Sequence, residues 1–257
     1  LSAYVGIPSS SASYTVDDHA LQDALPIEIS GNTDPAIQAE LDKVAKIRNM
    51  LALNEEIELV ARLTTAVTTT DTPTTKFDNY DAGADDDDPV QFITSQYYKI
   101  EDAVGASPNL LVLDSKVAIA LFNSPEFRER MKYTLPPNQT GPTEDIMQRA
   151  LAAILGLEQV RITSGLKNTA KKGQTASTSR IWGDTCLLAY VEPPSLEYAG
   201  LGQTFVWRTG GGAAVDGLLV EREYVMRKRS DIFYVHRYRC QKIINATAGV
   251  LLTDTLT

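Results

Sequence analysis

Two histidines and two cysteines are the side chains in this sequence best suited to acid–base or nucleophilic chemistry: His19, His236, Cys186 and Cys240. No local pattern joins either histidine to a nucleophile, and the sequence contains no G-x-S-x-G elbow, H-E-x-x-H helix or paired C-x-x-C motif. We therefore interpret His236 as a partly buried structural residue and Cys240, on the same face of a predicted strand, as a core residue. Two cysteines make neither a disulfide framework nor a zinc pattern, so we expect both to be reduced in a cytoplasmic setting. The sequence predicts no catalytic residue, no metal site and no cofactor.

Four consecutive aspartates, Asp85 to Asp88, are the strongest candidate for a metal site. Carboxylates are suitable ligands for calcium or magnesium, but this run lacks the alternating spacing of a calcium loop. We favour a solvated acidic loop whose last member, Asp88, caps the next helix ahead of Pro89.

Basic residues cluster in two places. Leu166 to Arg180 holds four cations and no acidic residue, namely Lys167, Lys171, Lys172 and Arg180. A contact with anions or nucleic acid is one interpretation; we favour a polar loop, because the segment has no aromatic residue for base stacking and no phosphate-loop pattern. The Arg227-Lys228-Arg229 turn is either a solvated hairpin end or a salt-bridging contact to an acidic segment of a neighbouring subunit.

Charge is distributed unevenly along the 257 residues, whose net charge is −9. Residues 1–100 carry 17 acidic and 6 basic side chains, whereas residues 101–257 carry 16 and 18. This balance disfavours tight nucleic-acid binding by phosphate neutralisation. No apolar run approaches the roughly 20 residues of a membrane span, and no signal peptide is seen. The first residue is Leu1, for which we expect either proteolytic removal of an upstream segment or a preceding segment outside this sequence.

A long helix over Asp34–Leu63 is the element around which we expect the chain to be organised. Asp34 and Pro35 are suited to its N-terminus, and Asn54 could mark a kink. Its predicted apolar stripe runs through Ile37, Leu41, Val44, Ile47, Leu51, Leu53, Ile57, Val60 and Leu63. Because charged residues fill its other positions, this helix needs a sheet or neighbouring subunits to pack on.

The remaining pattern indicates an α+β fold. Residues 1–33 predict a weak two-stranded ribbon with its turn near Asp17–Asp18, ordered by another chain. Residues 89–165 alternate helices and strands. The predicted elements are a helix over Pro89–Val104 ended by Gly105, a buried strand over Asn109–Asp114, helices from Ser115, Ser124 and Thr143, and strands over Val160–Thr163, Ile181–Val191 and Gln203–Arg208. Long antiparallel strands follow from Leu218, and the long helix is expected to cover their apolar face.

This order of elements resembles the major capsid proteins of tailed bacteriophages with the Hong Kong phage capsid fold. The resemblance rests on four stretches in order: Met50–Glu56, Ser107–Leu113, Ile181–Asp184 and the closing run from Arg229 to Asp254. It implies an N-terminal arm and extended loop in residues 1–33 and a peripheral domain with its spine helix in 34–108. It further implies an axial domain in 109–217 and peripheral strands in 218–257.

The resemblance also implies a function without an active site. The chain would assemble with itself, as pentamers and hexamers, into an icosahedral shell around double-stranded DNA that it binds without sequence specificity. Its further partners would be a portal protein and a scaffolding or decoration protein, with no membrane. Its place would be the virion capsid, assembled in the host cytoplasm.

Some family members join their subunits by a lysine–asparagine bond from the extended loop. The first lysine here is Lys43, inside the predicted helix, so we expect no such crosslink at that position. The alternatives are an encapsulin-type compartment of the same fold and an α/β enzyme built on residues 89–192.

Overall fold

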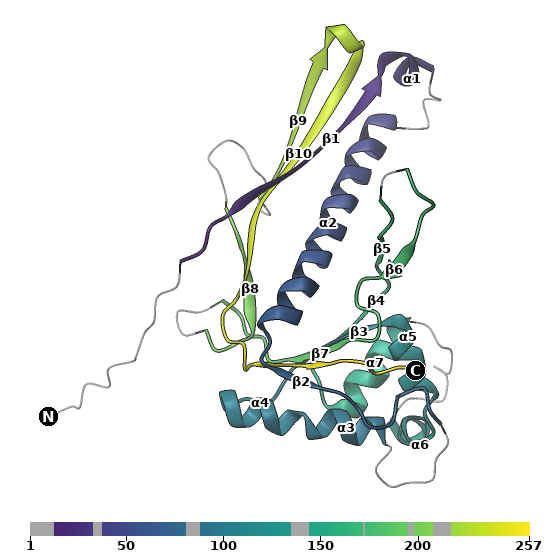
Figure 1. Cartoon of the computed structure of the whole chain (residues 1–257), viewed down its shortest axis with the longest axis vertical. Helices are drawn as coiled ribbons and strands as arrows, with labels where there is room; N and C mark the ends of the chain where they lie inside the picture. Colours follow the sequence, from purple (N-terminus) through teal and green to yellow (C-terminus); the bar gives the residue numbers. More distant parts are fainter. Residues whose placement is uncertain are drawn as a thin grey trace, which may run out of the picture. The chain divides into compact units, whose positions relative to one another are not determined.

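The computed structural model describes residues 13–32, 38–80, 88–134, 144–171, 173–194, 198–207 and 217–257 (Figure 1). The chain divides into two compact units. Unit 1 comprises residues 1–51 and 204–242, and unit 2 comprises residues 52–203 and 243–257. The fold is mixed α+β. These units do not follow the four ranges expected from the sequence, because residues 52–108 and 243–257 belong to unit 2.

One helix, α2 (Ala39–Ala66), contributes residues to both units. It continues as a helix through Asn54, whose side-chain amide donates a 2.7 Å hydrogen bond to the Glu58 carboxylate one turn later. The predicted cap at Asp34 and Pro35 lies outside the described residues.

Unit 1 contains a sheet centred on β10 (Ser230–Ile243). β1 (Asp17–Pro26) pairs with it antiparallel on one side, and β9 (Leu218–Val225) and β8 (Gly202–Val206) pair with it on the other. The predicted turn at Asp17–Asp18 is wrong. Both residues begin the continuous strand β1. This strand forms because β10, which is distant in sequence, pairs with it at ten positions from Asp17 to Pro26.

The N-terminal half of α2 runs beside this sheet (Figure 1) and shares a small core with it. Ile47 and Leu51 of the helix pack with Leu25, Phe233 and Val235 of the strands, which confirms that the helix covers the late strands.

Leu41, which the predicted stripe included, is instead 62% exposed. A step of three residues falls about 60° short of a full turn, so the stripe leaves the covered face when it is followed from Ile47 back through Val44.

Unit 2 contains a five-stranded sheet in the order β2-β11-β7-β3-β4. Its strands are Thr69–Asp71, Gly249–Leu252, Cys186–Ala189, Leu110–Asp114 and Gln159–Thr163, respectively. The expectation that residues 218–257 form one antiparallel set of strands fails for β11, which lies between β2 and β7 in this second sheet. The predicted strand over Ile181–Val191 shortens to β7, and Ile181 and Trp182 are buried in a turn before it.

The helices of unit 2 largely follow the predicted boundaries. Asp88 caps α3 (Pro89–Ser95) by accepting from the Val90 amide at 2.8 Å, and Gly105 ends α4 (Tyr97–Val104) with a φ of 76°. The single helix expected over this stretch is interrupted at the buried Gln96. The helices α5, α6 and α7 span Ser115–Asn123, Pro125–Thr134 and Glu144–Leu155.

Alternate residues of the unit 2 strands serve two separate cores. In β7, Cys186 and Leu188 pack with α3 to α7, while Leu187 and Ala189 pack with the C-terminal half of α2. β11 divides in the same way between Val250 and Leu251. This period of two explains why these short strands are apolar throughout.

Candidate functional site

The residues best suited to catalysis divide between the two units: Cys186 lies in unit 2, whereas His19, His236 and Cys240 lie in the sheet of unit 1. Cys186 is fully buried, and burial raises the pKa of its thiol to about 12, so the thiolate is scarce at neutral pH. Cys240 lies on β10, half-buried, and both cysteines are free. His236 on β10 contacts the Asp18 carboxylate of β1, with Nδ1 3.0 Å from Oδ2. His19 lies on β1 beside Asp18.

Asp88 has the structural role that its position before Pro89 predicts. Besides capping α3, its carboxylate accepts a 2.6 Å hydrogen bond from Arg130 of α6. Asp85, Asp86 and Asp87 lie outside the described residues. Within the described ranges, no group of three or more His, Cys, Asp or Glu side chains could hold a metal ion. The described helices include none that is long and apolar enough to cross a bilayer.

The basic segment Leu166–Arg180 forms a hairpin of β5 (Leu166–Asn168) and β6 (Thr178–Arg180), separate from the five-stranded sheet (Figure 1). Arg180 donates 2.7 Å hydrogen bonds to the carboxylate of Asp114 and the hydroxyl of Ser115. The Arg180 guanidinium therefore already has partners within its own chain. Lys167 and Lys171 remain on the hairpin, and Lys172 lies outside the described residues.

Unit 1 carries most of the exposed large apolar side chains. Of the sixteen among the described residues, eleven belong to unit 1: Tyr14, Leu21, Ile27, Ile29, Leu41, Met50, Val206, Trp207, Val220, Tyr224 and Met226. Among the described residues, the same unit buries six hydrophobic side chains, five of which form its core cluster. Apolar surface in excess of the core is typical of a surface that binds a partner.

The end of the β9–β10 hairpin combines apolar and cationic groups. Met226 is 81% exposed and precedes the three exposed cations. α1 (Ile27–Asn32), whose Ile29 is 55% exposed, lies near this end of the hairpin (Figure 1). Backbone contacts join the two segments, since the Ile27 amide donates to the Arg229 carbonyl at 3.1 Å. We call Ile27, Ile29, Met226 and residues 227–229 the hairpin-end surface.

Ion pairs tie α2 to both flanking strands of unit 1. Lys43 donates to Asp23 of β1 at 2.7 Å, and this hydrogen bond lowers the pKa of the Asp23 carboxyl. Arg222 of β9 contacts Glu40 of α2 at 3.1 Å and Asp231 of β10 at 2.7 Å. The Lys43 ammonium thus has an internal partner.

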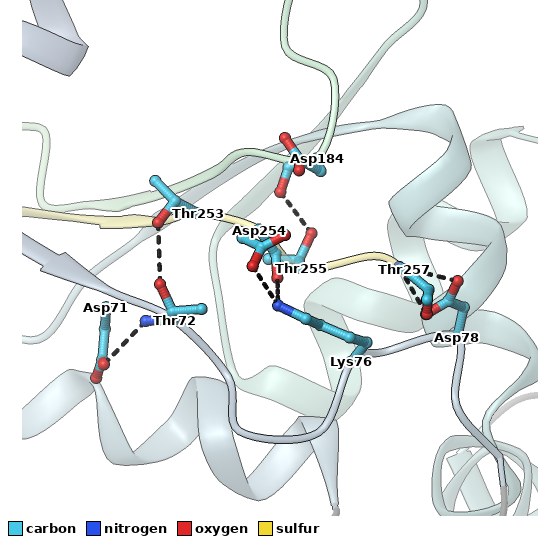
Figure 2. Close-up of polar contacts among 9 residues, drawn as sticks. All are labelled: Asp71, Thr72, Lys76, Asp78, Asp184, Thr253, Asp254, Thr255 and Thr257. Atoms are coloured by element: carbon cyan, nitrogen blue, oxygen red, sulfur yellow. Dashed lines mark hydrogen bonds and ion pairs between the residues drawn. The ribbon is translucent and has the colours of Figure 1, made fainter.

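A set of polar contacts holds residues 253–257 against the segment that follows β2 (Figure 2). Lys76 donates to both the carbonyl and the carboxylate of Asp254, at 2.6 and 2.5 Å. The Thr257 hydroxyl donates to Asp78 at 2.8 Å, and the buried Thr255 hydroxyl donates to the Asp184 carbonyl at 2.6 Å. We call these contacts the C-terminal clasp.

The sequence interpretation missed the apolar part of the hairpin-end surface. Ile27 and Ile29 were assigned to a weak ribbon, because a helix of six residues gives almost no periodic signal. One available signal was Met226, an apolar residue directly before three cations at a turn.

No family model and no curated protein matches the sequence. Solved structures do match. A phage-related protein from Bordetella bronchiseptica is 22% identical, with a TM-score of 0.69 over 94% of this chain and 77% of that one. The SrpI encapsulin of Synechococcus elongatus is 13% identical, with a TM-score of 0.58 over 93% and 74%. The major capsid protein of Phage G is 7% identical, with a TM-score of 0.52 over 99% and 79%.

These likenesses run along nearly the whole chain, whereas the identities are low, so they establish the fold. The chain has the fold of bacteriophage major capsid proteins, an architecture that encapsulin shells share.

Proposed function

We propose that this chain is the major capsid protein of a tailed bacteriophage with the Hong Kong phage fold. It assembles through pentamers and hexamers into an icosahedral shell that encloses double-stranded DNA. The axial role falls to the five-stranded sheet and its helices, most of which lie in residues 109–217. The peripheral role falls to β1, β9, β10 and the N-terminal half of α2.

The observation that carries this proposal is the imbalance within unit 1. Among its described residues, six buried hydrophobic side chains are a small core for a unit of about 90 residues, and eleven large apolar side chains remain exposed. Burying apolar surface contributes about 25 cal/mol per Å² to folding. A core this small therefore offsets only a small part of the conformational entropy that the unit loses when it folds. Contacts with further copies would bury the exposed groups and stabilise the unit.

Electron microscopy of the purified protein, together with its sedimentation profile, tests the proposal. We expect closed shells tens of nanometres across or stable rings of five and six. A protein that stays a monomer or dimer of 28.1 kDa chains at all concentrations would contradict the shell function.

An encapsulin-type compartment is the second candidate, favoured by the likeness to the SrpI encapsulin. The contents of purified shells distinguish the two functions. Nuclease-resistant double-stranded DNA supports the capsid, whereas a co-purifying protein cargo without DNA supports the compartment.

A further inference from the structure

The β5–β6 hairpin has no hydrophobic support of its own. β5 and β6 pair only with each other, and no described residue from 166 to 180 belongs to a buried hydrophobic cluster. Leu166 is 53% exposed. Its internal contacts are hydrogen bonds, such as those from the Thr169 amide to Ser177 and from the Ala170 amide to Asn168. An isolated two-stranded hairpin is marginal in water, so this one is suited to packing on something else.

The base of the hairpin is nevertheless firmly fixed. The carboxylate of Asp114 is completely buried at the end of β3, where one oxygen caps α5 and accepts from Arg180 at 2.7 Å. A buried carboxylate is costly unless it is paired, so the position of Arg180 is strongly constrained. The backbone bond from Ile181 to Gly165, at 3.0 Å, closes the same base. The base of the hairpin is thus held in place, and the hairpin carries Lys167 and Lys171.

A complementary surface lies on unit 1. Residues directly opposite in paired strands share a face, and side chains alternate between faces along each strand. Glu223 lies opposite Ile232, Glu221 opposite Tyr234, and Asp18 opposite Tyr238, so these three carboxylates share one face of the sheet. Phe233 and Val235, which pack on α2, lie on the other face. Between Ser230 and Cys240 the carboxylate face carries no lysine or arginine.

We propose that the β5–β6 hairpin of one copy docks on the acidic sheet face of a second copy, with Lys167 and Lys171 against Glu221, Glu223 and Asp18. The hairpin and the face are different surfaces of one chain, so the contact is head-to-tail, the type that closes into rings. An acidic protein face suits this hairpin better than nucleic acid, because the hairpin has no aromatic side chain for base stacking. This inference rests on the proposed shell function and names a contact within it.

Charge reversal tests the contact. The quantity measured is the protein concentration at which half of the chains sediment as assembled particles. Lys167→Glu with Lys171→Glu, and separately Glu221→Lys with Glu223→Lys, should each raise that concentration at least about tenfold, because like charges then face each other. Combining all four substitutions should restore it to within about threefold of the unaltered chain. Lys116→Glu, an exposed cation of α5 outside the hairpin, is the matched control and should have no effect.

Each other result is decisive. The proposed contact fails if either reversal assembles normally, or if the fourfold variant is no better than the double variants. Hairpin variants that form normal shells but lose nuclease-protected DNA would instead place the hairpin against nucleic acid. An unaltered chain that never assembles would remove the shell function itself.

A covalent measurement guards against misfolded variants. In a Cys240→Ser background, Lys171→Cys combined with Glu221→Cys should give a ladder of disulfide-linked oligomers on a denaturing gel after mild oxidation of assembled particles. In the same background, Lys171→Cys alone and Glu221→Cys alone should give no ladder. Particles of the double variant that oxidise without a ladder would overturn the contact.

Discussion

At the scale of single residues, a buried charge and a buried thiol set the local chemistry. Asp114 has no solvent exposure and depends on Arg180, which is itself partly exposed. Cys186 lies on β7 between the two cores of unit 2. Among the described residues, neither is part of a catalytic arrangement. Changes in stability at Asp114 and in reactivity at Cys186 therefore measure how well the interior is packed.

Removing Arg180 should destabilise the fold because it leaves Asp114 charged and unpaired in the interior. We expect Arg180→Ala to lower the free energy of unfolding by roughly 2–4 kcal/mol, as measured by urea denaturation. Adding Asp114→Asn should recover part of that loss, because asparagine keeps the helix cap without the charge. Arg149→Ala, which removes an exposed cation, should change stability by no more than about 0.5 kcal/mol. Equal losses for Arg149→Ala and Arg180→Ala would refute this account.

The two cysteines should differ in reactivity toward a thiol-specific reagent at pH 8. Cys186 is fully buried and has a pKa of about 12, so we expect no labelling of it in the native protein and full labelling in guanidinium. Cys240→Ser should remove any native-state labelling. Rapid modification of Cys186 in the folded chain would show that the interior of unit 2 opens readily.

At the scale of elements, the sequence predicts best what local contacts decide. The cap at Asp88 and the stop at Gly105 follow from side-chain chemistry and backbone freedom within a few residues, and both predictions are confirmed. Errors arise where a distant partner decides. Asp17 and Asp18 lie in a strand because β10 pairs with them. β11 pairs with β7, a partner that the apolar pattern of β11 alone does not indicate.

The hairpin-end surface was the least predictable part. Its charges are visible in the sequence as Arg227-Lys228-Arg229, but its apolar members come from α1 and from the β9–β10 turn, 200 residues apart. Leu41 fits an apolar stripe by type, yet it is exposed because the sheet covers only one sector of α2.

The C-terminal clasp should make stability depend on acid pH through Asp78. Burial alone would raise the pKa of this carboxyl, but hydrogen bonds from the side chain and amide of Thr257 outweigh it and lower the pKa below 3.8. The stabilisation is therefore complete above pH 3.8 and is lost as the pH falls through the lowered value.

Urea denaturation of Asp78→Asn checks this dependence. The unaltered chain should be more stable than the variant at pH 6, and the difference should shrink as the pH falls below 3.8. Asp102→Asn, which neutralises an exposed carboxylate of α4, is the control and should show no such pH-dependent difference. A difference for Asp78→Asn that does not change with falling pH would exclude the hydrogen-bonded carboxylate as its origin.

At the scale of the whole molecule, the proposed assembly requires that exposed apolar groups contribute to association more than to folding. Met226 and Ile29 are exposed in the single chain, so Met226→Gln with Ile29→Gln should change its free energy of unfolding by no more than about 0.5 kcal/mol. The same variant should raise the concentration for half-assembly about tenfold, measured by sedimentation.

Tyr98→Gln, an equally exposed position on α4 of unit 2, is the control for general surface effects. Assembly that is unchanged in the Met226 and Ile29 variant would remove the hairpin-end surface from the interface. A large loss of stability in the isolated chain would show that these side chains pack within the copy that carries them.

The interleaving of the two units along the chain also affects the timing of synthesis. Unit 1 draws on residues before 52 and after 203, so it is incomplete until the ribosome has made β10, and unit 2 is incomplete until β11 can pair with β2. A nascent chain therefore lacks the acidic face until β10 is made, and it lacks the complete five-stranded sheet until β11 is made. Polysomes should be free of partial shells, and particles should grow only from released chains.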